Sequence, residues 1–132
     1  MRFLKLLFIL VLLLSGCNQE KPSSPSESTK AFFEYAFNGN YSKMKTHMNK
    51  QLLEIVEESY GMEEYVYDVT DNGSIKSISI IKEVIDGNRA TVHYLAKMKN
   101  GKEEEQKTYL IREDDLWKFK FIQLSEIKEF PK

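Results

Sequence analysis

Apolar side chains recur at helical spacing soon after residue 24, and this pattern predicts an amphipathic helix. Ser24 followed by Pro25 and Glu27 is typical of a helix start, with a hydroxyl cap, proline at the first helical position and an acidic first turn. Gly39 is the residue type that commonly ends a helix. The predicted apolar face consists of Phe32, Phe33, Ala36 and Phe37.

A second helical pattern lies between Asn40 and Gly61, and Asn40 is a good N-cap residue. The apolar positions in register along it are Met44, Met48, Leu52, Ile55 and Val56. The pattern fits one continuous helix, and it equally fits a helix that restarts after Asn49.

From Ser74 onward the hydrophobic period changes to two, which indicates β-strands. Four strand-like runs follow, and short loops rich in Gly, Asn and Asp separate them, as expected for hairpins. One face of the second run carries Ala90, Val92, Tyr94, Ala96 and Met98, and the last run alternates Trp117, Phe119 and Phe121 with lysines. Short turns make neighbouring strands antiparallel. We therefore predict an α+β fold, with N-terminal helices packed on one face of a curved four-stranded antiparallel meander.

The first strand changes parity part-way along its length. Ile78 and Ile80 fall on one face, whereas Ile81 and Ile85 fall on the other. An extra residue in one strand restores the alternation, so the change predicts a β-bulge near Ile80.

The N-terminus carries an apolar run from Leu6 to Leu14, preceded by Arg2 and Lys5. This run has about half the length that a membrane-spanning helix needs. A basic start, a short apolar stretch and small residues afterwards are typical of a secretory signal peptide, here residues 1–16.

The residues Leu14-Ser15-Gly16-Cys17 resemble the lipobox of bacterial lipoproteins, and Cys17 is the only cysteine of the chain. The resemblance implies cleavage between Gly16 and Cys17, lipid attachment to Cys17, and anchoring at the extracytoplasmic face of the bacterial cell membrane. Two alternatives are an ordinary secretory signal followed by a free cysteine, and an uncleaved anchor. A lone thiol is unusual in a secreted protein, and lipidation would consume it.

Residues 17–24 are polar and contain Pro22, which is typical of a flexible tether, so we expect a single domain over residues 25–132.

The charge composition of the chain narrows the choice of partners. The chain has 19 Lys and Arg against 20 Asp and Glu, and two of the basic residues lie in the predicted leader, which leaves a net charge of about −3. This balance argues against a nucleic-acid partner.

A family resemblance adds to this reading. The capped Phe-rich helix, the phrase Phe37-Asn38-Gly39-Asn40-Tyr41-Ser42-Lys43-Met44 and the closing Trp117-Lys118-Phe119 resemble the nuclear transport factor 2-like, or cystatin-like, superfamily. More narrowly, they resemble its small bacterial lipoproteins of uncharacterised function. The resemblance implies an apolar pocket on the concave face of the sheet. The expected lining residues are Phe33, Phe37, Tyr94 and Trp117. The alternative is that these side chains fill the core.

Catalytic members of this superfamily carry an acid or base in that pocket. Glu83 is the best candidate carboxylate, although it lies near a strand end, and His93 has the wrong parity if Tyr94 faces inward. His47 lies on or beside the buried helical stripe, where a structural histidine is the commoner case.

Two distant histidines make a poor metal site, so we expect no metal and no cofactor. The segment from Asp68 to Gly73 imitates the start of a calcium loop, but Ser79 stands where the closing glutamate belongs, which favours a turn.

Two function classes fit this chain. The first is a non-catalytic, membrane-anchored domain that binds an envelope protein or an apolar small molecule, and the second is a small pocket enzyme such as an isomerase or hydratase. The missing pocket acid and base favour the first class. The segment holding Tyr60, Tyr65 and Tyr67 would be an interaction surface or a loop that covers the open end of the sheet.

Overall fold

The computed structural model describes residues 24–59 and 61–132. The predicted signal peptide, Cys17, Tyr60 and all of the tether before Ser24 lie outside the described residues. Within the described part, no helix is both long and apolar enough to cross a membrane.

Helices form the first half of the domain. The α-helices are α2 (Pro25–Phe37), α3 (Tyr41–Met44), α4 (Lys50–Ser59) and α5 (Met62–Val69), and the 3₁₀ helix η1 (Lys45–His47) follows α3. The hydroxyl of Ser24 caps α2 by accepting a hydrogen bond of 3.1 Å from the backbone N–H of Glu27. After the C-cap Asn38, Gly39 has φ +68°, the left-handed conformation that glycine adopts without a steric penalty.

The second helical stretch is broken at Asn49, so the restart is the correct alternative. The backbone N–H of Asn49 donates a 2.9 Å hydrogen bond to the carbonyl of Phe119, and Met48 forms an isolated parallel bridge with the same residue. This contact holds the chain extended at Met48. The side chain of Asn49 then accepts a 2.9 Å hydrogen bond from Leu52 N–H and caps the new helix.

Helix α5 differs from the loop considered for the tyrosine-rich segment. Its residues Tyr65, Val66 and Val69 pack against the core, and this apolar contact stabilises a helix that is too short to be stable alone. Tyr65 is buried and Tyr67 is 54% exposed, so the two tyrosines do not share one surface.

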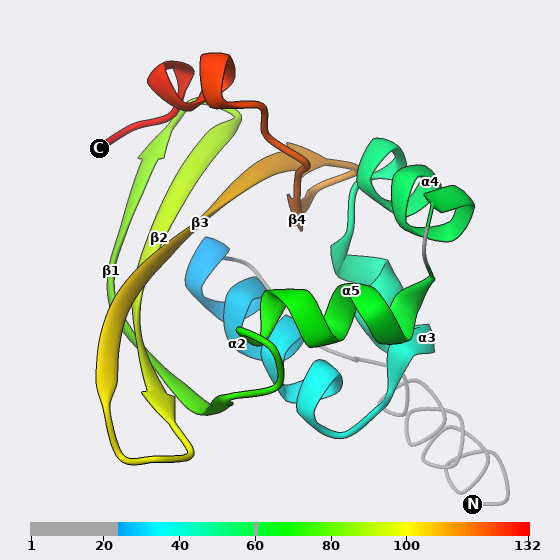
Figure 1. The fold of residues 1–132 in the computed structure, drawn as a ribbon. Helices are drawn as coiled ribbons and strands as arrows, with labels where there is room; N and C mark the ends of the chain where they lie inside the picture. Colours follow the sequence, from blue (N-terminus) through cyan, green and yellow to red (C-terminus); the bar gives the residue numbers. More distant parts are fainter. Residues whose placement is uncertain (1–23, 60) are drawn as a thin grey trace, which may run out of the picture.

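A four-stranded antiparallel sheet forms the second half, in the order β1 (Ile75–Asp86), β2 (Arg89–Met98), β3 (Glu103–Glu113) and β4 (Leu116–Phe119). Figure 1 shows the sheet curving around the helices, which lie on its concave face. The predicted α+β class and the meander order are confirmed. The predicted bulge is also present, as a register shift between Ile80 and Lys82.

The last strand is shorter than the alternation of aromatic residues predicts. It ends at Phe119, and Phe121 lies beyond it and is 42% exposed. The chain then forms the 3₁₀ helix η2 (Leu124–Glu129), at the end of the sheet where β1 turns into β2 (Figure 1). Phe130 is buried against Tyr109, with ring centroids 5.2 Å apart.

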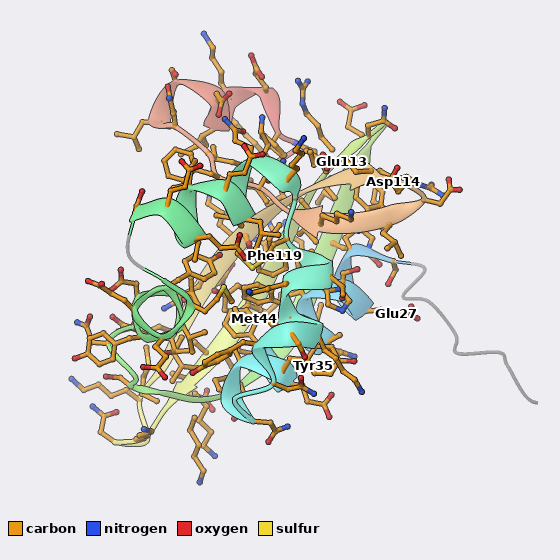
Figure 2. The ribbon with its side chains drawn as sticks, turned by 90° about the vertical axis from the view of Figure 1, so that its right-hand side faces the viewer. Glu27, Tyr35, Met44, Glu113, Asp114 and Phe119 are labelled. Carbon is orange, nitrogen blue, oxygen red and sulfur yellow. The ribbon has the colours of Figure 1, made fainter. Side chains whose placement is uncertain are left out.

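The core lies between the concave face and the helices. Figure 2 shows Met44 and Phe119 in the interior, whereas Glu27 and Tyr35 lie toward the surface. The buried apolar side chains of the sheet include Ala90, Val92, Tyr94, Ala96, Met98, Leu110, Trp117 and Phe119. Helix α2 contributes Phe32, Phe33 and Ala36 to the same core.

Candidate binding groove

The four side chains predicted to line a pocket occupy different environments. The ring centroids of Phe33 and Tyr94 are 5.2 Å apart, and both residues are buried in the core. Trp117 is also buried, and the Arg112 guanidinium lies over its ring at 6.0 Å from the centroid. Phe37 differs from the other three because it is 39% exposed.

Tyr94 has a polar partner that the sequence pattern did not reveal. Its hydroxyl donates a 3.0 Å hydrogen bond to Oε1 of Gln106, which lies directly opposite on β3. Burial raises the pKa of Tyr94 to about 12. The phenol is therefore a neutral, hydrogen-bonded part of the core.

A first hollow of about 300 Å³ lies between the outer side of α2 and the beginning of β1. Phe33 and Phe37 are its aromatic side chains, and Ile78 lines it from the strand. The polar lining residues are Lys30, Glu34, Asn38 and Ser77. The formal charges of Lys30 and Glu34 therefore cancel at this hollow.

A second hollow of about 320 Å³ lies beyond Phe37, between α2, α5 and the start of β1. Its apolar lining comes from Ala36, Phe37, Val66 and Ile75. The remaining lining residues are Thr70, Gly73, Lys76 and Lys99. Because Phe37 lines both hollows, we refer to the two together as the Phe37 groove.

A third hollow of about 340 Å³ adjoins the second, with which it shares Gly73 and Lys99. It is more polar, since Asp71, Asn100, Lys102 and Glu104 are among its lining residues. Apolar area is thus concentrated around Phe37.

His47, the last residue of η1, is buried and lines none of these three hollows. Its ring is stacked on Tyr35 with centroids 5.7 Å apart. Burial lowers the pKa of His47, and the positive charge of Lys118 lowers it further. A neutral, stacked imidazole of this kind is a packing residue.

Glu83 and His93 lie on the sheet without converging on a pocket. Glu83 is exposed on β1, an edge strand of the described sheet, opposite Val92. His93 lies on the outer face, where Nδ1 is 3.5 Å from Glu105 Oε1 and Nε2 is buried without a hydrogen-bond partner among the described residues. Neither residue lines any of the three hollows.

The described residues contain no group of three or more His, Cys, Asp or Glu side chains suited to a metal ion. The segment Asp68–Gly73 forms the end of α5 and the predicted turn, in which Asp71 and Asn72 have positive φ values. The Gly73 N–H donates a hydrogen bond to the Tyr67 carbonyl. This turn places Gly73 at the edge of the second hollow.

Comparison of the sequence with protein families gives a match over residues 15–120 to a domain of unknown function, DUF4878. The chain belongs to the DUF4878 family. The match covers the helices and all four strands, whereas η2 and Phe130 lie beyond it.

One of the solved structures that align with this chain has the same fold. A SEC-C motif containing protein from Rhodopseudomonas palustris aligns with a TM-score of 0.58 and 10% identity, over 77% of this chain and 79% of that one. A protein from Campylobacter jejuni described as an NTF2-like transpeptidase aligns with a TM-score of 0.49 and 18% identity, over 74% of this chain and 97% of that one. Comparison with curated proteins finds no match. At 10% identity, the likeness to the Rhodopseudomonas palustris protein concerns the fold alone.

Proposed function

We propose that this chain is a lipid-anchored lipoprotein on the extracytoplasmic face of the cell membrane, and that its domain binds a ligand in the Phe37 groove without catalysing a reaction. One observation carries the binding part of the proposal. Phe33, Tyr94 and Trp117 are buried, whereas Phe37 keeps 39% of its surface exposed between two open hollows. An exposed aromatic ring beside concave apolar surface is typical of a binding site.

The chemistry of the groove supports binding over catalysis. A general acid or base needs to reach the reacting proton and to have a pKa tuned by its surroundings. The acidic side chain that lines the groove, Glu34, is exposed on α2, and the buried groups His47 and Tyr94 line neither hollow. The groove therefore offers apolar side chains and charged groups that can contact a ligand, as a binding domain requires.

The anchor part of the proposal rests on the sequence Leu14-Ser15-Gly16-Cys17. Metabolic labelling with an alkyne fatty acid tests it directly. Label on the wild-type chain that is lost in Cys17→Ala supports lipidation. Label that persists in the variant, or no label on either chain, contradicts it.

Helix α2 relates the proposed anchor to the groove. The tether enters at Pro25, and Phe37 lies at the other end of the same helix, about 18 Å away along the axis. In an anchored molecule, the groove would thus lie at the opposite end of α2 from the membrane attachment.

Native mass spectrometry of the full chain, purified in mild detergent from its own host, tests ligand binding. We expect a reproducible small-molecule adduct that is lost in Phe37→Ser. It should be retained in the matched control Phe121→Ser, because the Phe121 ring is 42% exposed and lines none of the three hollows. An adduct that survives Phe37→Ser would place the site elsewhere. If an isolated adduct is chemically altered on incubation with the protein, the enzyme alternative would be correct.

A further inference from the structure

The three hollows differ in charge, and the difference points to one of them. The first hollow has one lysine and one glutamate, and the third has two lysines, one aspartate and one glutamate. The second hollow is lined by Lys76 and Lys99 and by no acidic residue. Positive charge therefore exceeds negative charge only at the second of these hollows, even though the chain as a whole carries a net charge of −1.

Strand pairing and a backbone hydrogen bond fix the main chain at both lysines. Lys76 lies where the register of β1 against β2 shifts, between Ile75 and Ser77. The N–H of Lys99 donates a 2.8 Å hydrogen bond to the carbonyl of Ser74, which joins the β2–β3 loop to the turn before β1. The two lysines that line this hollow thus come from separate segments.

Neither ammonium group has an ion-pair partner among the described residues. Four other lysines of the described residues do have one, for example Lys45 with Glu57 at 3.0 Å. Two unpaired lysines on one hollow can both donate charge-assisted hydrogen bonds to a single anionic group.

The apolar lining of the second hollow favours a ligand with an apolar part. Ala36, Phe37, Val66 and Ile75 form this lining. Thr70, the C-cap of α5, is the other lining residue with a side-chain donor, and its hydroxyl already donates to the carbonyl of Val66 at 2.6 Å. Donors for a ligand are therefore concentrated at the two lysines, and the rest of the surface offers apolar contact.

We propose that the second hollow binds a free amphiphile with a carboxylate head group, whose carboxylate pairs with Lys76 and Lys99 while its hydrocarbon part packs on Phe37. This inference rests on the proposed function, because it assigns a ligand class to the Phe37 groove. The volume of about 320 Å³ falls at the lower end of small-molecule sites, which are roughly 300–1,000 Å³. A free molecule is favoured over a bilayer lipid because a hollow at the lower end of this range accommodates a small ligand.

Photo-crosslinking tests this proposal on the full chain in phosphatidylcholine nanodiscs, with empty nanodiscs as the background. The probes are an octanoic acid that carries a diazirine on its chain and the primary amide of the same acid. We expect the acid to label the segments around Ala36–Phe37 and Thr70–Lys76 saturably, at concentrations about tenfold lower than the amide.

Variants that remove charge separate the role of the two lysines from that of the apolar lining. The double variant Lys76→Gln/Lys99→Gln is expected to raise the half-saturating acid concentration about tenfold and to leave amide labelling unchanged. The matched control Lys97→Gln/Lys107→Gln removes two lysines from the outer sheet face and should leave both probes unchanged. Circular dichroism checks that each variant is folded.

Three results would overturn the proposal. Equal labelling by acid and amide that is lost in Phe37→Ser would retain the groove as a binding site and reject the carboxylate. Saturable labelling that maps outside the second hollow would reject this site. If neither probe labels the groove saturably, the amphiphile is the wrong ligand class, and the adduct experiment described under Proposed function still decides whether the groove binds anything.

Discussion

Phe32 and Phe119 are stacked, with ring centroids 3.8 Å apart and an interplanar angle of 18°. One ring comes from the first described helix, α2, and the other from the last strand, β4. The carbonyl of Phe119 also accepts the hydrogen bond that interrupts the second helical stretch at Asn49. This contact therefore connects the two ends of the family-matched domain through its core.

Loss of the Phe32 ring should destabilise the fold strongly. Phe32 is fully buried, so we expect Phe32→Ala to lower the free energy of unfolding by about 3–5 kcal/mol. Urea unfolding, followed by the fluorescence of the sole tryptophan Trp117, measures this change. The control Phe37→Ala removes an exposed ring and should cost about 1 kcal/mol or less. Similar losses in both variants would contradict the packing described.

His47 should make stability depend on pH under mildly acidic conditions. Burial and the charge of Lys118 keep its pKa below the usual 6.5 in the folded state, so the unfolded state takes up a proton first as the pH falls. Neutral His47 therefore makes its full contribution to the free energy of unfolding above pH 6.5. This contribution is lost as the pH falls below that value toward the folded-state pKa.

The measurement is the free energy of unfolding between about pH 7 and pH 5. We expect His47→Gln to show a smaller fall than the wild type. Lys118→Met removes only the lesser cause of the shift and should keep most of the fall. Parallel curves for the wild type and His47→Gln would show that another group is responsible.

Tyr94 should be detectable in an alkaline titration. Its pKa of about 12 lies above the usual 10.0, so its contribution to stability is present below pH 10 and is lost as the pH rises through the folded-state value. Absorbance of the seven tyrosines at alkaline pH should show a late component that disappears in Tyr94→Phe. Tyr67→Phe, in which an exposed tyrosine is changed, should retain that component.

The C-terminal segment should contribute measurably to stability although the family match ends at residue 120. Phe130 is 4% exposed, packs on Tyr109 and lies 5.8 Å from the Arg89 guanidinium. We expect Phe130→Ala to lower the free energy of unfolding by about 3 kcal/mol. Leu124→Ala, at a side chain that is 89% exposed, should change it by less than about 0.5 kcal/mol. An unchanged stability in Phe130→Ala would mean that this segment is dispensable for the fold.

Much of the fold could be predicted from the sequence because its signals are local. The period-two alternation and the short turns determine the strands and their order, and the parity change near Ile80 reveals the bulge. The break at Asn49 and the helix α5 could not be settled in this way. Both depend on contacts with distant parts of the chain, Phe119 for the break and the core for Tyr65.

The hydrogen bond between Tyr94 and Gln106 illustrates how a site detail is missed. A two-residue turn at Asn100-Gly101 would place Lys107 opposite Tyr94. The observed loop is longer by one residue, since Lys97 pairs with Glu103 and the Met98 N–H bonds the Lys102 carbonyl. This shift of one position brings Gln106 to Tyr94.

The groove itself was predictable only in part. The helical spacing places Phe33 and Phe37 on one face, but it cannot show that one ring is covered and the other is not. Lys76 and Lys99 are 23 positions apart and belong to segments whose pairing register brings them together. No local pattern marks either lysine as a site residue.

The bulge in β1 also bears on how copies of this chain can coexist at high density. β1 is an outermost strand of the described sheet, and a long strand in that position can act as a template for fibril growth. Here the ladder is interrupted after Ile80, and Lys82 follows directly with an exposed charge. A second molecule could extend a regular ladder only along residues 77–80 or 82–86, which is too little for a cooperative cross-β stack. We therefore expect the bulge also to limit the seeding of aggregation by the exposed residues Ile81 and Ile85.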